Sequence, residues 1–229
     1  MTKHMSSFMV RLLSTAVLLL TCNSVIAEEK ESSGLLKQQA TVAELIKLLS
    51  ATKGMSARFH QESMSANGEA LQQTQGTMKL QRPGKFYWHT LEPFEQEINS
   101  DGKRIWVYDV DLEQVSIQDV DPGLGQTPAA LLSGEPDKVV RKFYVERSLQ
   151  AGGIWRYTLK PREENALFSS VELQFSGKAL VYMKLSDSLS QTTTVQFADV
   201  KLNPDFSPQA FMLQFPEGVD IIDSSLSQP

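Results

Sequence analysis

The sequence predicts a mainly β protein whose strands form a sandwich or a curled, barrel-like antiparallel sheet. Three observations predict this class. Apolar and polar residues alternate in many short runs, glycine-containing turn signals separate these runs, and only one long helical pattern occurs. A chain with roughly nine to eleven such runs and little helix has to fold its sheet into one of these two forms.

The helical pattern comes before the strands. Thr41 and Glu44 have the spacing of a capping box, in which each side chain accepts from a backbone N–H of the first turn, so the sequence predicts a helix that begins near Thr41. The pattern ends near Gly54. Its apolar residues recur at helical spacing: Val42, Leu45, Ile46 and Leu49.

The strand pattern starts at Ser56. Alternation with a period of two, which is typical of strands with one buried face, is clearest around residues 77–81, 155–160 and 171–175. The turn signals predict antiparallel hairpins between successive strands. These signals are Asn67-Gly68, Pro83-Gly84, Asp101-Gly102, Ser176-Gly177 and Asn203-Pro204.

One segment, residues 122–136, breaks the alternation. Thr127 as a cap and Pro128 at the first helical position predict a short helix, which Gly134 and Pro136 are expected to end. Its two leucines, Leu131 and Leu132, need an apolar surface to cover. The sequence therefore predicts a lid over the mouth of the curled sheet.

The first 27 residues have the pattern of an export signal. Lys3 and Arg11 precede an apolar run over residues 12–20 that is too short to span a bilayer, and cleavage fits best after Ala27. Residues 28–229 are then expected to form a single domain. Cys22, the one cysteine, would be removed with the signal, and Thr21 before it disfavours a lipid-anchored N-terminus.

Charge and motifs exclude several classes of function. Loss of Lys3 and Arg11 leaves 20 basic residues against 27 acidic ones, a net charge of −7 that disfavours nucleic acid as a partner. Nucleophile elbows, phosphate-binding loops and zinc-ligand spacings are absent from the sequence. His60 and His89 lie in strand patterns and are interpreted as ordinary strand residues, so the sequence predicts no enzyme, cofactor or metal site.

The aromatic residues around the predicted hairpins allow two interpretations. They either fill an ordinary core or, under the lid, line a cavity. Acidic residues near the same hairpins, from Asp109 to Asp121, are interpreted as a solvated edge that discourages pairing with other sheets. The aromatic set consists of Phe86, Tyr87, Trp88, Trp106 and Tyr108.

The segment from Gly76 to Trp88, GTMKLQRPGKFYW, resembles the signature of the LolA family of outer-membrane lipoprotein carriers. The resemblance covers most of the chain after the export signal, in the family's order. Further segments that carry it are Ala57–Gln61, Ser100–Lys103 with Trp106 and Tyr108, Thr127–Leu132, and Phe211–Asp220.

This resemblance implies an incomplete antiparallel barrel in the periplasm, with an N-terminal helix and a short lid helix over a hydrophobic cavity. It implies a monomer that takes lipoproteins from an inner-membrane ABC transporter of the LolCDE type to an outer-membrane receptor of the LolB type. Arg82 matches a family arginine that latches the lid, and Phe86 an aromatic residue linked to loading. The expected cavity residues are Phe59, Met78, Leu80, Phe86, Trp88, Trp106 and Tyr108, and the expected lid residues are Pro128, Leu131 and Leu132.

Three other functions remain open at this point. A lipid-anchored receptor of the same pathway has the same fold, but Thr21 before Cys22 disfavours it. A lipid-sensing regulatory protein of similar fold needs a further domain. A lipid hydrolase needs a nucleophile that the sequence does not show.

Overall fold

A computed structural model describes residues 34–120, 128–164 and 166–224. In these residues a helix over positions 34–51 precedes twelve strands, which confirms the mainly β class. The strands are β1 Gly54–Met64, β2 Ala70–Gln81, β3 Lys85–Glu92, β4 Gln96–Asp101, β5 Arg104–Asp109, β6 Gln114–Asp119, β7 Phe143–Leu149, β8 Ile154–Pro161, β9 Phe168–Ser176, β10 Ala179–Asp187, β11 Thr192–Leu202 and β12 Asp220–Asp223. The short helices are α2 Pro128–Ser133, α3 Pro136–Val140, η1 Ala151–Gly153 and η2 Pro208–Phe211.

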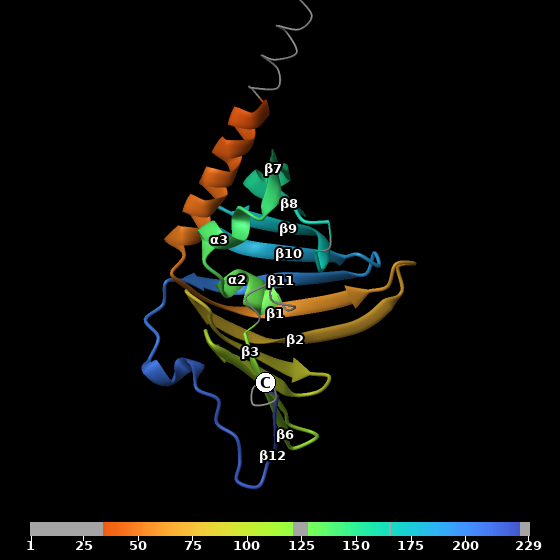
Figure 1. The fold of residues 1–229 in the computed structure, drawn as a ribbon, viewed down its shortest axis with the longest axis vertical. Helices are drawn as coiled ribbons and strands as arrows, with labels where there is room; N and C mark the ends of the chain where they lie inside the picture. The colour runs from red at the N-terminus through yellow and green to blue at the C-terminus, as the bar shows by residue number, and fades with distance from the viewer. Residues whose placement is uncertain (1–33, 121–127, 165, 225–229) are drawn as a thin grey trace, which may run out of the picture. The chain divides into compact units, whose positions relative to one another are not determined.

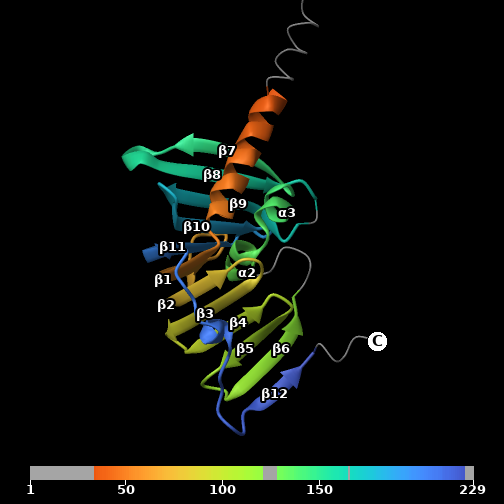
Figure 2. The same ribbon diagram turned by 90° about the vertical axis from the view of Figure 1, so that its left-hand side faces the viewer.

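All twelve strands belong to one sheet, in the order β12-β6-β5-β4-β3-β2-β1-β11-β10-β9-β8-β7 (Figure 1). Neighbours are antiparallel except β12, which lies parallel to β6 (Figure 2). The two edge strands, β7 and β12, do not pair with each other, so the sheet of the described residues is open. This confirms the expected half-open sheet and excludes the sandwich.

The middle of the sheet joins distant parts of the chain. Strand β1 pairs with β2, its neighbour in sequence, and also with β11, with Met55 opposite Leu202. Just beyond β11, the side-chain oxygen of Asn203 accepts the N–H of Lys53 at 2.7 Å, and its amide donates to the carbonyl of Ala51 at 3.0 Å. Asn203 therefore binds the end of the N-terminal helix, 150 positions away.

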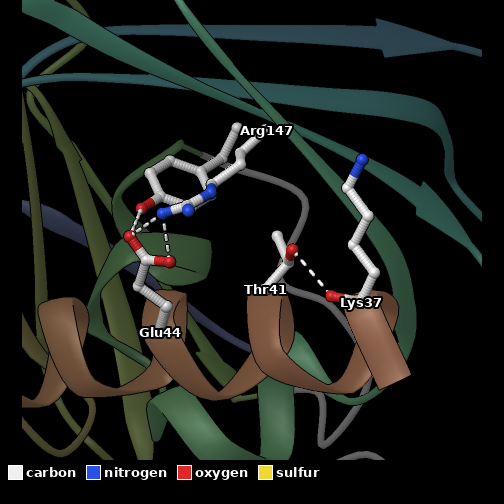
Figure 3. Close-up of polar contacts among 5 residues, drawn as sticks. Lys37, Thr41, Glu44 and Arg147 are labelled. Carbon is white, nitrogen blue, oxygen red and sulfur yellow. Dashed lines mark hydrogen bonds and ion pairs between the residues drawn. The ribbon is translucent and has the colours of Figure 1, made fainter. Parts of the chain in front are cut away.

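The N-terminal helix does not begin at Thr41 as predicted, because residues 34–40 are already helical. Thr41 consequently has no free N–H to cap, and its hydroxyl donates to the carbonyl of Lys37 one turn earlier, at 2.9 Å (Figure 3). Glu44 does not reach back to a backbone N–H either. Its carboxylate binds the Arg147 guanidinium of β7 and accepts from the Tyr157 hydroxyl of β8 at 3.1 Å.

The core lies between one face of the sheet, called the inner face here, and the helices that contact it. Val42, Leu45 and Leu49 are buried in this core together with residues of α2 and α3. Pro136, expected only to end the lid helix, occupies the first turn of α3. Among the described residues, no helix is both long and apolar enough to cross a membrane.

Candidate functional site

The inner face of β1, β2 and β3 is strongly apolar. The strand register places Met78 opposite Trp88 and Leu80 opposite Phe86, so these four side chains share one face. Phe59 of β1 joins them, and its ring stacks on that of Trp88 with centroids 4.1 Å apart. All five are at least 95% buried. The structure thus brings together five of the seven expected cavity residues.

Gly76 explains how Phe59 and Trp88 come into contact. A side chain at this position would put its Cβ 1.9 Å from the carbonyl oxygen of His89 on β3 and 3.0 Å from the Phe59 ring. Only glycine leaves room for this close approach of backbone and ring.

Helix α2 covers this apolar face. Its described residues, Pro128–Ser133, contact β2 and β3. Leu131 and Leu132 are 8% and 4% exposed and belong to the same buried cluster as the strand residues. The expected cap, Thr127, lies outside the described residues.

The space between α2 and the sheet is almost completely filled. Next to Arg82, Leu131 and Leu132 lies a void of about 20 Å³, which is enough for roughly one water molecule. An acyl chain cannot enter this space unless α2 or the side chains below it move. The structure therefore shows a closed arrangement.

An open cavity of about 520 Å³ adjoins the filled region at the start of α2. Trp88 and Ile98 form part of its floor, and Pro128 and Ala129 of α2 form one side. The volume lies in the range of roughly 300 to 1,000 Å³ that ligand sites occupy. The other lining residues are Gln61, Gln72, Thr74, Thr90, Phe94, Gln96, Asp109, Asp111 and Leu112.

The lining of this cavity has a mixed character. Its glutamines, threonines and two aspartates are polar, whereas Phe94 and Leu112 are 66% and 68% exposed. Thr74 and Thr90 are buried beside Trp88, so apolar and polar side chains are mixed over the whole lining of the cavity. Such a surface suits a molecule with an apolar tail and a polar head.

Arg82 lies at the end of β2, beneath the lid. Its Nη1 donates to the carbonyl oxygen of Thr52 at 2.5 Å, and its backbone N–H donates to the carbonyl of Lys53 at 2.9 Å. Its Nε is buried and has no hydrogen-bond partner among the described residues. Burial lowers the pKa of the guanidinium to about 10.

The hydrogen bond of Arg82 differs from the expected latch. The guanidinium binds the end of the N-terminal helix and not a carbonyl of the lid helix. The direct polar link to the lid is a backbone one, in which the N–H of Gly84 donates to the carbonyl of Ser133 at 2.8 Å. Arg82 does lie beside the lid, because it lines the small void together with Leu131 and Leu132.

Trp106 and Tyr108 lie on the other face of the sheet, so the expectation that they line the cavity is wrong. The register places Ile98 opposite Val107 on the inner face, whereas Asn99 opposes Trp106 and Glu97 opposes Tyr108 on the outer face. Residues 105–108 are all apolar, so the sequence shows no alternation that would indicate which face of this strand is buried.

The C-terminal segment covers this outer face. The side-chain amide of Asn99 donates to the carbonyl of Phe211 in η2, and the ring of Tyr108 lies 6.4 Å from that of Phe215. Val115 of β6 opposes Tyr108 and is fully buried. Tyr108 is therefore part of a second, smaller packed layer with Val115 and Phe211.

Sequence reasoning missed Ile98, which the structure places on the cavity floor. Strand β4 reads Gln-Glu-Ile-Asn-Ser-Asp. With a single apolar residue it shows no alternation of apolar and polar residues by which a strand could be recognised. The turn signal at Asp101-Gly102 was the one indication that a strand precedes it.

Comparisons with known proteins agree with these features. A family model described as outer membrane lipoprotein carrier protein LolA matches residues 50–214. An outer-membrane lipoprotein carrier protein of Pseudomonas fluorescens is 40% identical over 93% of this chain and 98% of its own. One of Pseudomonas syringae pv. syringae is 43% identical over 79% of this chain and 87% of its own.

Among solved structures, an uncharacterised conserved protein from Thermus thermophilus superimposes with a TM-score of 0.50. The alignment covers 80% of this chain and 96% of that one, at 11% sequence identity. This likeness concerns the fold alone.

Proposed function

This chain belongs to the LolA family of outer-membrane lipoprotein carrier proteins, and on that premise we propose that it carries lipoproteins by hiding their acyl chains under helix α2. One observation supports the proposal most directly: an apolar inner face, closed by α2, continues into an open cavity lined by both apolar and polar side chains.

Acyl chains make such a carrier necessary. Each methylene exposed to water costs about 0.8 kcal/mol, so a sixteen-carbon chain costs on the order of 12 kcal/mol. A permanently open apolar groove would aggregate or adhere to membranes. A carrier that is filled and closed when empty, as in this structure, avoids that exposure.

The cavity indicates where loading begins. An acyl chain would first contact Trp88 and Ile98 at the open cavity and then displace Leu131 and Leu132 from the inner face. Polar lining residues that are at least partly exposed, Gln61, Gln72 and Gln96, would face the glyceryl and peptide part of the lipoprotein. The path requires movement of α2 and no chemical step.

The proposal extends to targeting and partners. Residues 1–27 act as a cleaved signal peptide, and residues 28–229 form the carrier domain in the periplasm. The carrier accepts its cargo from a LolCDE-type transporter and delivers it to a LolB-type receptor. Mass spectrometry of the exported protein should find Glu28 at its N-terminus. A mass with lipid on Cys22 would favour the anchored-receptor alternative.

The central test is a transfer assay. Inner-membrane vesicles that contain the transporter and a labelled lipoprotein are incubated with ATP and the purified protein. The lipoprotein should appear in the supernatant in a complex with this chain. It should remain in the membrane without the protein, and equal release with an unrelated periplasmic protein would contradict the proposal.

A further inference from the structure

We propose that His89, Glu95 and Glu97 form a binding site for one Zn²⁺ ion on the outer face of the hairpin formed by β3 and β4. His89 and Glu97 are directly opposite each other in the register of these strands. Glu95 lies in the turn between them. One ligand atom from each residue lies within 4.8 Å of the other two.

The distances suit a zinc ion. Nε2 of His89 is 2.9 Å from Oε1 of Glu95 and 3.9 Å from Oε1 of Glu97. In a tetrahedral site with bonds of about 2.1 Å, neighbouring ligand atoms are roughly 3.4 Å apart. Side-chain shifts on the order of 1 Å therefore complete three corners of the tetrahedron, without movement of the strands.

The ligand types favour Zn²⁺ over the hard cations. One imidazole and two carboxylates, with water in the fourth position, form a donor set that zinc accepts, whereas Ca²⁺ and Mg²⁺ prefer oxygen ligands alone. Among the ion pairs of the described residues, neither Glu95 nor Glu97 has a lysine or arginine partner. A divalent cation would neutralise both carboxylates.

The surroundings support an ordered site. The side chains of His89 and Glu97 are 20% and 19% exposed, so they are largely shielded by the sheet. Tyr87 lies on the same face as His89 and Glu97, because residues alternate along β3 and His89 opposes Glu97. Glu95 is 45% exposed, so solvent reaches its carboxylate, and water can supply the fourth ligand.

The site lies directly behind the cavity. Residues alternate across the hairpin, so Trp88 and Ile98, the neighbours of His89 and Glu97 in sequence, point to the inner face and line the cavity. A bound ion would hold the two strands together at the place where ligand enters. The ion is a structural one and takes no part in cargo chemistry.

The test uses the full exported protein without a histidine tag, freed of metal by a chelator that is then removed. Titration with ZnCl₂ in a calorimeter should show one site of micromolar or tighter affinity. Zinc at about one hundred times its Kd should also raise the melting temperature by roughly 5 °C or more. CaCl₂ should give neither response.

Matched variants locate the ion. His89→Gln and Glu97→Gln should each weaken Zn²⁺ binding at least tenfold, while His60→Gln should leave it unchanged, since His60 lies on the same face two strands away. If either variant fails to fold by circular dichroism, Glu95→Gln in the exposed turn takes its place. Wild-type affinity in His89→Gln, equal binding of Ca²⁺, or no zinc binding below about 1 mM would each overturn the site. Acyl-chain binding is measured separately, so the two proposals fail independently.

Discussion

Arg82 donates a hydrogen bond from Nη1 to the carbonyl oxygen of Thr52, 2.5 Å away, where the N-terminal helix ends. Its Nε remains buried without a partner among the described residues. Since an unsatisfied buried donor costs about 1–3 kcal/mol, the unpaired Nε makes the closed arrangement less stable than it would be with this group paired. A closed arrangement weakened in this way suits a helix α2 that has to move when cargo enters.

Arg82→Leu is therefore expected to shift the balance toward a state that holds cargo. The variant should accept lipoprotein but transfer it to receptor-containing liposomes at least tenfold more slowly, because closing the empty lid no longer helps to expel the acyl chains. Transfer is followed by sedimentation of labelled lipoprotein. A wild-type transfer rate would show that Arg82 has no role in release.

Trp88 and Trp106 should respond differently to a bound acyl chain. Trp88 lines the cavity, whereas Trp106 lies on the outer face. In variants that keep one of these two tryptophans and have phenylalanine at the other two tryptophan positions, a brominated triacyl peptide should quench the fluorescence of Trp88 strongly and that of Trp106 little. Equal quenching would mean that the ligand binds elsewhere.

Leu132→Ala should loosen the lid. Leu132 belongs to α2, is 4% exposed and is part of the buried cluster, so its truncation is expected to lower the free energy of unfolding by about 2–4 kcal/mol. The affinity for an apolar dye such as 1-anilinonaphthalene-8-sulfonate should rise, because less packing is lost on opening. Urea unfolding and dye titration check both effects. Weaker dye binding by a folded variant would contradict the role of α2 as a lid.

Gly76→Ala should disrupt the inner face, because its Cβ would meet the His89 carbonyl at 1.9 Å. That oxygen belongs to the backbone of β3 and cannot move without separating β2 from β3. A loss of about 3 kcal/mol or more is expected in urea unfolding. Gly34→Ala is the control, since no atom lies within 4 Å of the added carbon, and it should leave stability unchanged or slightly higher.

The raised pKa of Tyr157 leads us to expect that the free energy of unfolding depends on pH. Burial, followed by its hydrogen bond to Glu44, raises the pKa of this phenol above its ordinary value. Above about pH 10 the unfolded chain loses this proton first, so the folded state binds more protons and stability falls as pH rises. Tyr157→Phe should show a shallower decline in the free energy of unfolding between about pH 9 and pH 11. A decline equal to that of the wild type would exclude this contribution.

The fold was predicted best in segments where the alternation of apolar and polar residues has an unambiguous period. In β2 the alternation of Met78 and Leu80 with polar residues determined the buried face. The prediction failed for Trp106 and Tyr108, because four apolar residues in a row define a strand without defining a face. The C-terminal segment that covers them is distant in sequence and has no periodic pattern.

The helix start shows a second limit. Thr41 and Glu44 have the right types and spacing for a cap, but residues 34–40 favour helix themselves and continue it toward the N-terminus. The Glu44 carboxylate instead binds the guanidinium of Arg147, 103 positions away. Local spacing alone cannot reveal a partner at that distance.

The pairing of β1 with β11 also constrains how the chain acquires its structure. Strand β1 directly follows the N-terminal helix. One of its two neighbours, β11, is complete only when residue 202 has been synthesised. Contacts of such long separation slow folding, since the entropy of closing the intervening loop is lost before they form. A chain that crosses a membrane N-terminus first would therefore expose an unpaired β1 edge until residues 192–202 have also crossed.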